Sequence, residues 1–187
     1  MGGIVNPETG QVDWTFHVPL EEQVAFYRAH PPSALSGLTA RPIEVDFRFD
    51  GHGEPVNAIF ELTCACGSAL FVATCIVDDD SVAPPITLHC EGCEAEHVVY
   101  DRARHGYDAV AGGLPTEEPG DDSYPDDIPT DDVSLPYQVI VRFEFPSDHL
   151  GDAEWKGREQ ELFSWITFLA RDPSSGALEF LFDDECA

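Results

Sequence analysis

Four of the six cysteines of this 187-residue chain lie in two close pairs, and this spacing restricts how the middle of the chain can fold. The pairs are Cys64-Ala65-Cys66 and Cys90-Glu91-Gly92-Cys93, with 23 residues between Cys66 and Cys90. Two thiols so close in sequence lie on one tight turn. A second such turn beside the first completes a tetrahedral set of sulfur ligands, which is the set that zinc favours. The sequence therefore predicts two turns that face each other.

Strand-like runs flank both cysteine pairs. They cover residues 57–63 and 69–77 around the first pair and residues 86–88 and 96–100 around the second, with a reversal expected over 78–85. Gly67 directly follows Cys66, and a residue without a Cβ lets backbone amides bend toward a sulfur. The pairs are thus expected at the ends of antiparallel strands.

Residues 56–101, about a quarter of the chain, resemble a zinc ribbon of the rubredoxin-like kind, in which two knuckles at the tips of β-hairpins hold one structural zinc. The resemblance implies the ligands Cys64, Cys66, Cys90 and Cys93. Two features depart from the usual ribbon pattern. The first pair is spaced by one residue where two is usual, and Glu94 stands where the second knuckle often has glycine.

Other interpretations of the cysteines compete with the zinc ribbon. Four core thiols would be ordinary, because free cysteine is often buried, but this leaves the two close pairs unexplained. A redox pair would be expected at the start of a helix, whereas residues 95–100 predict a strand. His89 or His97 could replace one cysteine ligand or donate to the site from outside it. Cys75 is expected in the core and Cys186 is expected to be exposed.

The rest of the chain predicts an α+β, β-rich fold: an antiparallel sheet with an inserted zinc ribbon and one or two short helices. Clean alternation of apolar and polar residues predicts half-buried strands at 43–50 and 139–145, with Arg142 and Glu144 on the wet face of the second. The remaining expected elements are a hairpin of residues 3–5 and 12–16, a helix at 19–29 with Leu20, Val24 and Tyr27 inward, a short helix within 152–163, and strands at 164–170 and 177–182.

These elements are expected to form a single composite domain over residues 1–187, because the last part of the chain is small for a core of its own. The zinc-ribbon segment is residues 56–101. Residues 114–136 are expected to be an acidic, proline-rich linker or loop, since eight acids and no base occur between residues 117 and 132. Residues 137–187 are expected to be a C-terminal β segment that packs on the same sheet.

The charge balance limits the partners. Nine Lys and Arg face 36 Asp and Glu, which gives a formal charge of −27. Such a surface repels DNA, RNA and anionic membranes, so no direct nucleic-acid binding is expected, and a basic protein is the partner it favours. No signal peptide or membrane-spanning stretch is recognised, which predicts a cytoplasmic protein. The oligomeric state stays open, and adaptation to high salt is a second explanation of the acidity.

A zinc held by four cysteines has no open position, which is typical of a structural site. The sequence therefore predicts a non-enzymatic zinc-binding protein that acts as an acidic protein-binding or regulatory module, for example one that neutralises a toxin. The alternative is a metal-assisted hydrolase that uses polar residues around His105, which are Asp101, Arg102, Arg104, Tyr107 and Asp108. No serine elbow, phosphate-binding glycine loop or zinc-protease helix motif is present in the sequence.

Overall fold

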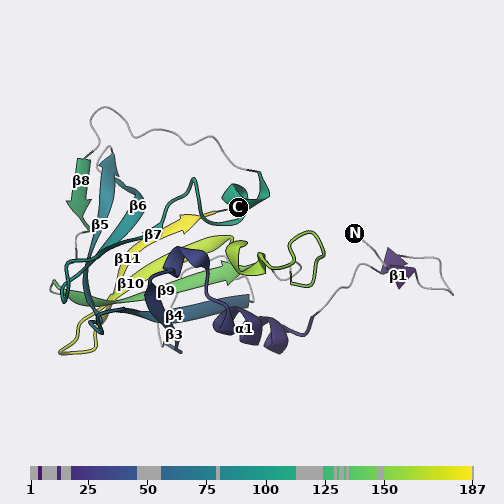
Figure 1. The fold of residues 1–187 in the computed structure, drawn as a ribbon, viewed down its shortest axis with the longest axis horizontal. Helices are drawn as coiled ribbons and strands as arrows, with labels where there is room; N and C mark the ends of the chain where they lie inside the picture. Colours follow the sequence, from purple (N-terminus) through teal and green to yellow (C-terminus); the bar gives the residue numbers. More distant parts are fainter. Residues whose placement is uncertain are drawn as a thin grey trace.

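The computed structural model describes residues 4–5, 12–13, 18–45, 56–78, 81–112, 124–128, 130, 133, 135–146 and 150–186. Within these residues, nine antiparallel strands form one curled sheet, and its successive neighbours are β11, β10, β9, β5, β6 and β7 (Figure 1). These six are Leu178–Glu185, Trp165–Arg171, Tyr137–Phe145, Leu70–Asp78, Ser81–Cys90 and Glu96–Tyr100. β3 (Leu38–Pro42), β4 (Val56–Cys64) and β8 (Tyr124–Asp127) attach beside this path. The β-rich, antiparallel class predicted from the sequence is confirmed.

The short helices are α1 (Leu20–Ala29), α2 (Tyr107–Ala111) and the 3₁₀ turns η1 (Ser33–Leu35) and η2 (Glu159–Glu161). The range predicted as a helix at 152–163 consists of turns apart from η2. The N-terminal hairpin is confirmed where it is described, since β1 (Ile4–Val5) pairs with β2 (Val12–Asp13), and residues 3 and 14–16 lie outside the described residues. In the described ranges, no helix is long and apolar enough to cross a membrane.

β9 changes partner along its length. Its first residues, Tyr137 and Gln138, pair with β5, whereas residues 140–145 pair with β4. β4 and β5, the strands on either side of the first cysteine pair, therefore diverge, and β5, β6 and β8 turn away from the long strands β4, β9 and β10 (Figure 1). The strands next to the cysteine pairs, β4 to β7, thus belong to the same sheet as β9, β10 and β11.

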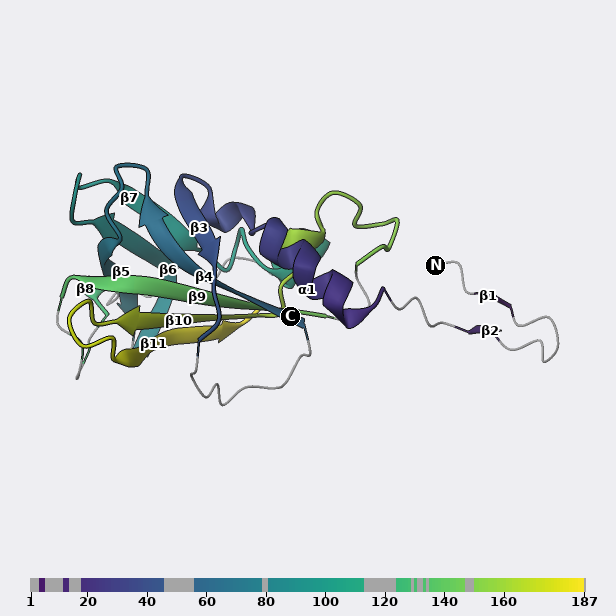
Figure 2. The ribbon, with the colours of Figure 1, turned by 90° about the horizontal axis from the view of Figure 1, so that it is seen from below.

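The main core lies inside the curl. Its largest buried side chains are aromatic, among them Phe60, Phe71, Phe143 and Phe168. α1 covers one part of this core (Figure 2), where Tyr27 is fully buried and stacks on Phe145 with ring centroids 3.7 Å apart. The expected inward face of this helix is confirmed for Tyr27 and for the partly buried Val24, but Leu20 is 48% exposed.

Side chains close the curl between the outer strands β7 and β11. The Tyr100 hydroxyl donates to Asp184 Oδ2 at 2.7 Å, and Cys186 Sγ lies 3.2 Å from the same hydroxyl oxygen. Cys186 is only 3% exposed, so the prediction of an exposed thiol is wrong. The reason is that the chain end is held by its backbone, because the Cys186 amide donates to the Ser164 carbonyl at 2.7 Å.

The two alternating segments behave differently from expectation. Residues 43–45 are not a strand, β3 lies just before them, and residues 46–50 lie outside the described residues. Ile43 still donates its amide to the Ile59 carbonyl at 2.9 Å, and both Ile43 and Val45 pack on a second apolar cluster. The alternation therefore identified residues that face an apolar surface, and the strand prediction is wrong for the described residues 43–45.

In β9 the inward face is confirmed, with Val139, Val141 and Phe143 fully buried. The prediction that Arg142 and Glu144 face water is wrong, because Arg142 is 8% and Glu144 only 1% exposed. Arg142 Nη1 lies 2.5 Å from Glu144 Oε1, so the two charges are buried as a pair. The physical reason is that β9 is central and carries apolar packing on both faces, and Ile140 belongs to the second cluster, with Ile59 and Leu169.

Part of the acidic segment lies on the sheet. Residues 124–127, expected as linker or loop, form β8 on the edge of β5, and the Ile128 amide donates to the Ala73 carbonyl at 2.9 Å. Ile128 and Val133 are buried in the main core. These two apolar side chains and the open edge of β5 explain why this part of the expected linker or loop lies on the sheet. Residues 113–123, 129, 131, 132 and 134 lie outside the described residues.

Candidate metal centre

Two tight turns of matching construction carry the cysteine pairs. In the first, between β4 and β5, the Gly67 amide donates to the Cys64 carbonyl and the Cys64 amide donates to the Ser68 carbonyl, both at 2.8 Å. In the second, between β6 and β7, the Glu94 amide donates to the Cys90 carbonyl at 2.8 Å and the Cys90 amide donates to the Ala95 carbonyl at 2.9 Å. We call these turns the first knuckle (residues 64–68) and the second knuckle (residues 90–95).

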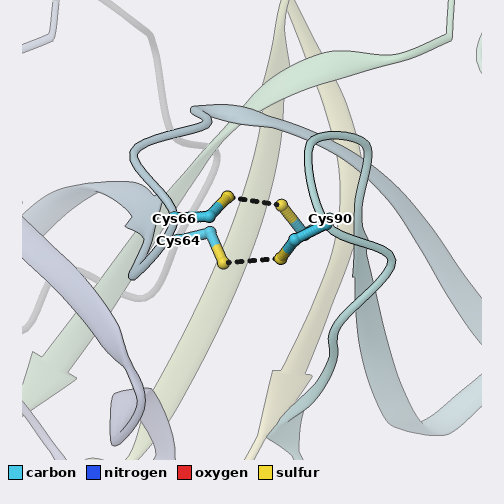
Figure 3. Close-up of side chains that lie close together, drawn as sticks. Cys64, Cys66 and Cys90 are labelled. Carbon is cyan, nitrogen blue, oxygen red and sulfur yellow. Dashed lines mark hydrogen bonds between the residues drawn. The ribbon is translucent and has the colours of Figure 1, made fainter.

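The four sulfurs gather between the knuckles. Cys64 Sγ lies 3.6 Å from Cys93 Sγ, and Cys66 Sγ lies 3.5 Å from Cys90 Sγ. All four sulfurs lie within 4.8 Å of one another, and Figure 3 shows the labelled Cys64, Cys66 and Cys90 pointing toward one another from opposing loops. A tetrahedron with Zn–S bonds near 2.3 Å has sulfurs about 3.8 Å apart, so the spacing fits a zinc ion.

The sequence prediction that two knuckles bring these thiols together is therefore confirmed. Among the described residues, the His, Cys, Asp and Glu side chains that lie close enough together to hold one metal ion are those of these four cysteines. The competing interpretations fit less well. Cys66 and Cys93 are exposed, which is unlike core thiols, and Cys93 is followed by β7, which is unlike the helix of a redox motif.

The thiols also perturb one another's protonation. For Cys93, the Ala95 amide lowers the pKa, but the thiols of Cys66, Cys64 and Cys90 outweigh it and raise the pKa to about 12. For Cys90, burial raises the pKa, but the Gly92 amide, the Cys66 thiol and the Cys93 amide outweigh it and lower the pKa to about 7. Metal ligation needs thiolates, so a bound cation would displace protons from this cluster and would bind less tightly as the pH falls.

The two histidines lie beside the cluster in different ways. His97 Nε2 is 3.6 Å from Cys64 Sγ, which places the imidazole against one sulfur from outside the group of four. His89 points elsewhere, with Nε2 3.0 Å from Thr74 Oγ1. His97 thus has the position of a neighbour that orients a ligand, and neither histidine is needed to complete four sulfurs.

Sequence reasoning missed how closely the knuckles approach. A Cβ on Gly92 would lie 2.8 Å from Ser68 Cβ and 3.2 Å from Cys66 Sγ. We expect Gly92→Ala to push the knuckles apart and to weaken metal binding at least tenfold, measured by competition with a chelator of known affinity. Adding Ser68→Gly removes the nearest atom and should restore part of the affinity. Unchanged affinity in Gly92→Ala would contradict the close approach.

Glu94 occupies the position where a ribbon knuckle often has glycine, and its φ is 59°. The left-handed region costs a residue with a Cβ roughly 1 kcal/mol, a cost that glycine avoids. We therefore expect Glu94→Gly to raise the free energy of unfolding by up to about 1 kcal/mol in urea titrations. Glu91→Gly on the same turn is the matched control and should not stabilise. A loss of stability in Glu94→Gly would show that the carboxylate has a role that the backbone does not reveal.

The polar residues around His105 are used in local contacts. His105 Nδ1 accepts a hydrogen bond from the Asp101 amide at 3.0 Å, and burial lowers the pKa of its imidazole. Arg102 pairs with Asp184, and the Asp108 amide donates to the Cys186 carbonyl at 2.9 Å. These contacts hold the segment after β7 against the end of β11. They bring no second set of metal ligands together among the described residues.

Comparisons of the chain with protein-family models, with curated proteins and with solved structures found no match. The four facing thiols on two matching knuckles are the feature of the described residues from which a function can be proposed.

Proposed function

We propose that the protein binds one structural zinc ion through Cys64, Cys66, Cys90 and Cys93, and that it acts in the cytoplasm as a non-enzymatic, acidic module that binds a basic protein. The observation that carries the proposal is the set of four sulfurs within 4.8 Å of one another on two knuckles. Such a site would fix the knuckles in the manner of the zinc ribbons that residues 56–101 resemble.

The donor set supports zinc and a structural role. Thiolates in a tetrahedral arrangement select zinc or iron, and the resemblance favours zinc. Four protein sulfurs leave no position for water or substrate, which is how structural zinc sites differ from catalytic ones. His105 accepts a hydrogen bond from the Asp101 amide and lies beside the Tyr100 ring, and these contacts do not favour the alternative of a metal-assisted hydrolase.

The metal part of the proposal is tested by elemental analysis of protein purified without oxygen, together with thiol titration. We expect about one zinc per chain and few reactive thiols in the native protein, because zinc would hold four thiols and the thiols of Cys75 and Cys186 are buried. Denaturation together with a strong chelator should release the zinc and raise the thiol count to six. Less than half an equivalent of zinc, or an equivalent of iron in its place, would contradict the proposal.

Charge supports a basic partner. The formal charge is −27, and exposed carboxylates also surround the second knuckle, at Glu91, Glu94 and Glu96. A surface of one sign accelerates association with a surface of the opposite sign and suppresses binding of like-charged partners. An acidic module of this kind could neutralise or regulate a cationic protein, such as a toxin or a nucleic-acid-binding protein.

The partner is tested by affinity capture from an extract of the source cells at low salt, followed by measurements on the purified candidate. We expect a basic protein whose Kd rises at least tenfold between 50 and 500 mM salt, because screening shortens the reach of the acidic surface. A variant with Asp121, Asp122, Asp126 and Asp127 changed to Asn should bind more weakly. A captured protein that is acidic, or whose Kd does not change with salt concentration, would count against the proposal of a basic partner.

A further inference from the structure

The four cysteines differ in how exposed they are to solvent, and each close contact between two sulfurs joins an exposed cysteine to a buried one. Cys66 and Cys93 are exposed, whereas Cys64 and Cys90 are buried. The short sulfur contacts join one exposed and one buried thiol from opposite knuckles, Cys93 with Cys64 at 3.6 Å and Cys66 with Cys90 at 3.5 Å. Each exposed cysteine therefore has its sulfur next to that of a buried cysteine from the other knuckle.

From this arrangement we propose that the centre is also an oxidation site: hydrogen peroxide attacks the exposed sulfurs, two disulfides form across the knuckles, Cys64–Cys93 and Cys66–Cys90, and the zinc ion leaves. The inference rests on the proposed zinc site. It adds to that site a reversible change of state, in which the knuckles exchange a metal link for covalent links.

The chemistry balances with peroxide as the oxidant. The Cys66 thiolate attacks one peroxide oxygen, the O–O bond breaks, and hydroxide leaves, so that Cys66 becomes a sulfenic acid. The Cys90 thiolate then attacks the Cys66 sulfur, the S–S bond forms, and the S–O bond breaks with loss of a second hydroxide. Two protons from solvent convert the hydroxides to water. The two thiolates of each pair give two electrons to one peroxide as their disulfide forms, and zinc departs as Zn²⁺.

The remaining two thiols lack these features. Cys75 is 2% and Cys186 is 3% exposed, and neither belongs to the sulfur group. Burial raises the pKa of both thiols, to about 12 for Cys186, so little reactive thiolate is present at neutral pH. Oxidation at the knuckles is thus expected to leave both in the reduced form.

The acidic surroundings favour a neutral oxidant. The exposed carboxylates of Glu91 and Glu94 lie next to Cys90 and Cys93 in the second knuckle, and the whole chain is strongly negative. An anionic disulfide such as oxidised glutathione is repelled by this field, whereas hydrogen peroxide carries no charge. Peroxide is for this reason the oxidant named in the proposal.

The test treats zinc-loaded full-length protein with hydrogen peroxide, follows zinc release with a coloured chelator, and maps the disulfides by mass spectrometry. We expect one zinc released for every two peroxides consumed, with Cys64–Cys93 and Cys66–Cys90 as the main links, and recovery of bound zinc after reduction. The double variant Cys75→Ala with Cys186→Ala should respond in the same way, because neither thiol takes part.

Three results would overturn the inference. They are retention of zinc under oxidation, links within a knuckle (Cys64–Cys66 or Cys90–Cys93), and overoxidised thiols in place of disulfides. A protein purified without zinc would instead contradict the proposed function, and peptide mapping of that metal-free protein would then show whether the knuckle thiols are joined across the pairs. The two failures are therefore distinguishable.

Discussion

Replacing the exposed Cys66 with serine is expected to lower the free energy of unfolding by about 4 kcal/mol or more, because it removes a ligand of the proposed metal, and effects of this size are exceptional for an exposed residue. Without a metal, the same change on an exposed turn should be nearly neutral, within about 0.5 kcal/mol. Cys66→Ser therefore separates the two cases more sharply than a buried cysteine would. Urea unfolding of the variant and the wild type, with zinc content measured on the same samples, provides the comparison.

Ala65→Ser is the matched control, because Ala65 is exposed between the two cysteines of the first knuckle. It should keep both the zinc and the stability of the wild type. Treating the wild type with a strong chelator should bring its stability down to that of Cys66→Ser, since binding energy at a structural site is folding energy. A Cys66→Ser protein as stable as the wild type would exclude a structural metal at these sulfurs.

A second large effect is expected in the middle of β9. Arg142→Met should destabilise the protein by roughly 3–5 kcal/mol, because it leaves the Glu144 carboxylate buried without its cationic neighbour. The double variant Arg142→Met with Glu144→Leu removes both charges from the same face. It should recover most of the lost stability, since a buried ion pair is often replaceable by apolar side chains of similar size.

Unfolding in urea of the two single variants and the double variant gives the coupling between Arg142 and Glu144 as a thermodynamic cycle. Arg171→Met provides a comparison, because Arg171 pairs with Glu61 at 2.6 Å while a quarter of its side chain is exposed. Its loss should cost far less than that of Arg142. Equal losses for the two arginines would mean that burial does not set the strength of these ion pairs.

The cysteine pairs were predictable because their chemistry is local. Two thiols one or two residues apart favour a turn, and the apolar runs on either side favour strands, so the grouping of the four sulfurs followed from the sequence. The reversal expected over residues 78–85 is wrong in its extent, because β6 already begins at Ser81. The order in which the strands pair in the sheet does not follow from the sequence. That β9 pairs first with β5 and then with β4 is a matter of contacts between residues far apart in the chain, which no short pattern contains.

Alternation along a strand distinguishes its two faces and leaves open whether the second face is covered. Arg142 and Glu144 were expected in water because charged residues usually are, yet they are buried. Ile140 interrupts the polar side of the same strand, and this was the available signal that apolar packing continues there. In the acidic segment, Ile128 and Val133 gave a similar signal, and both are buried although charge dominates the residues around them.

The contact that closes the curl has a consequence for self-association. Strands at the rim of a sheet carry unpaired backbone groups that can template pairing with another chain and lead to aggregation. Here the two outer strands β7 and β11 meet through Tyr100, Asp184 and Cys186, and exposed acids lie along them, at Glu96, Asp183 and Glu185. The Tyr100–Asp184 hydrogen bond ties the end of β7 to the end of β11. Exposed apolar side chains, Val98 and Phe180, lie on the same two strands beside these acids. We expect this contact and these acids to reduce edge-to-edge assembly at β7 and β11, while β3 and β8 are further outer strands of the sheet.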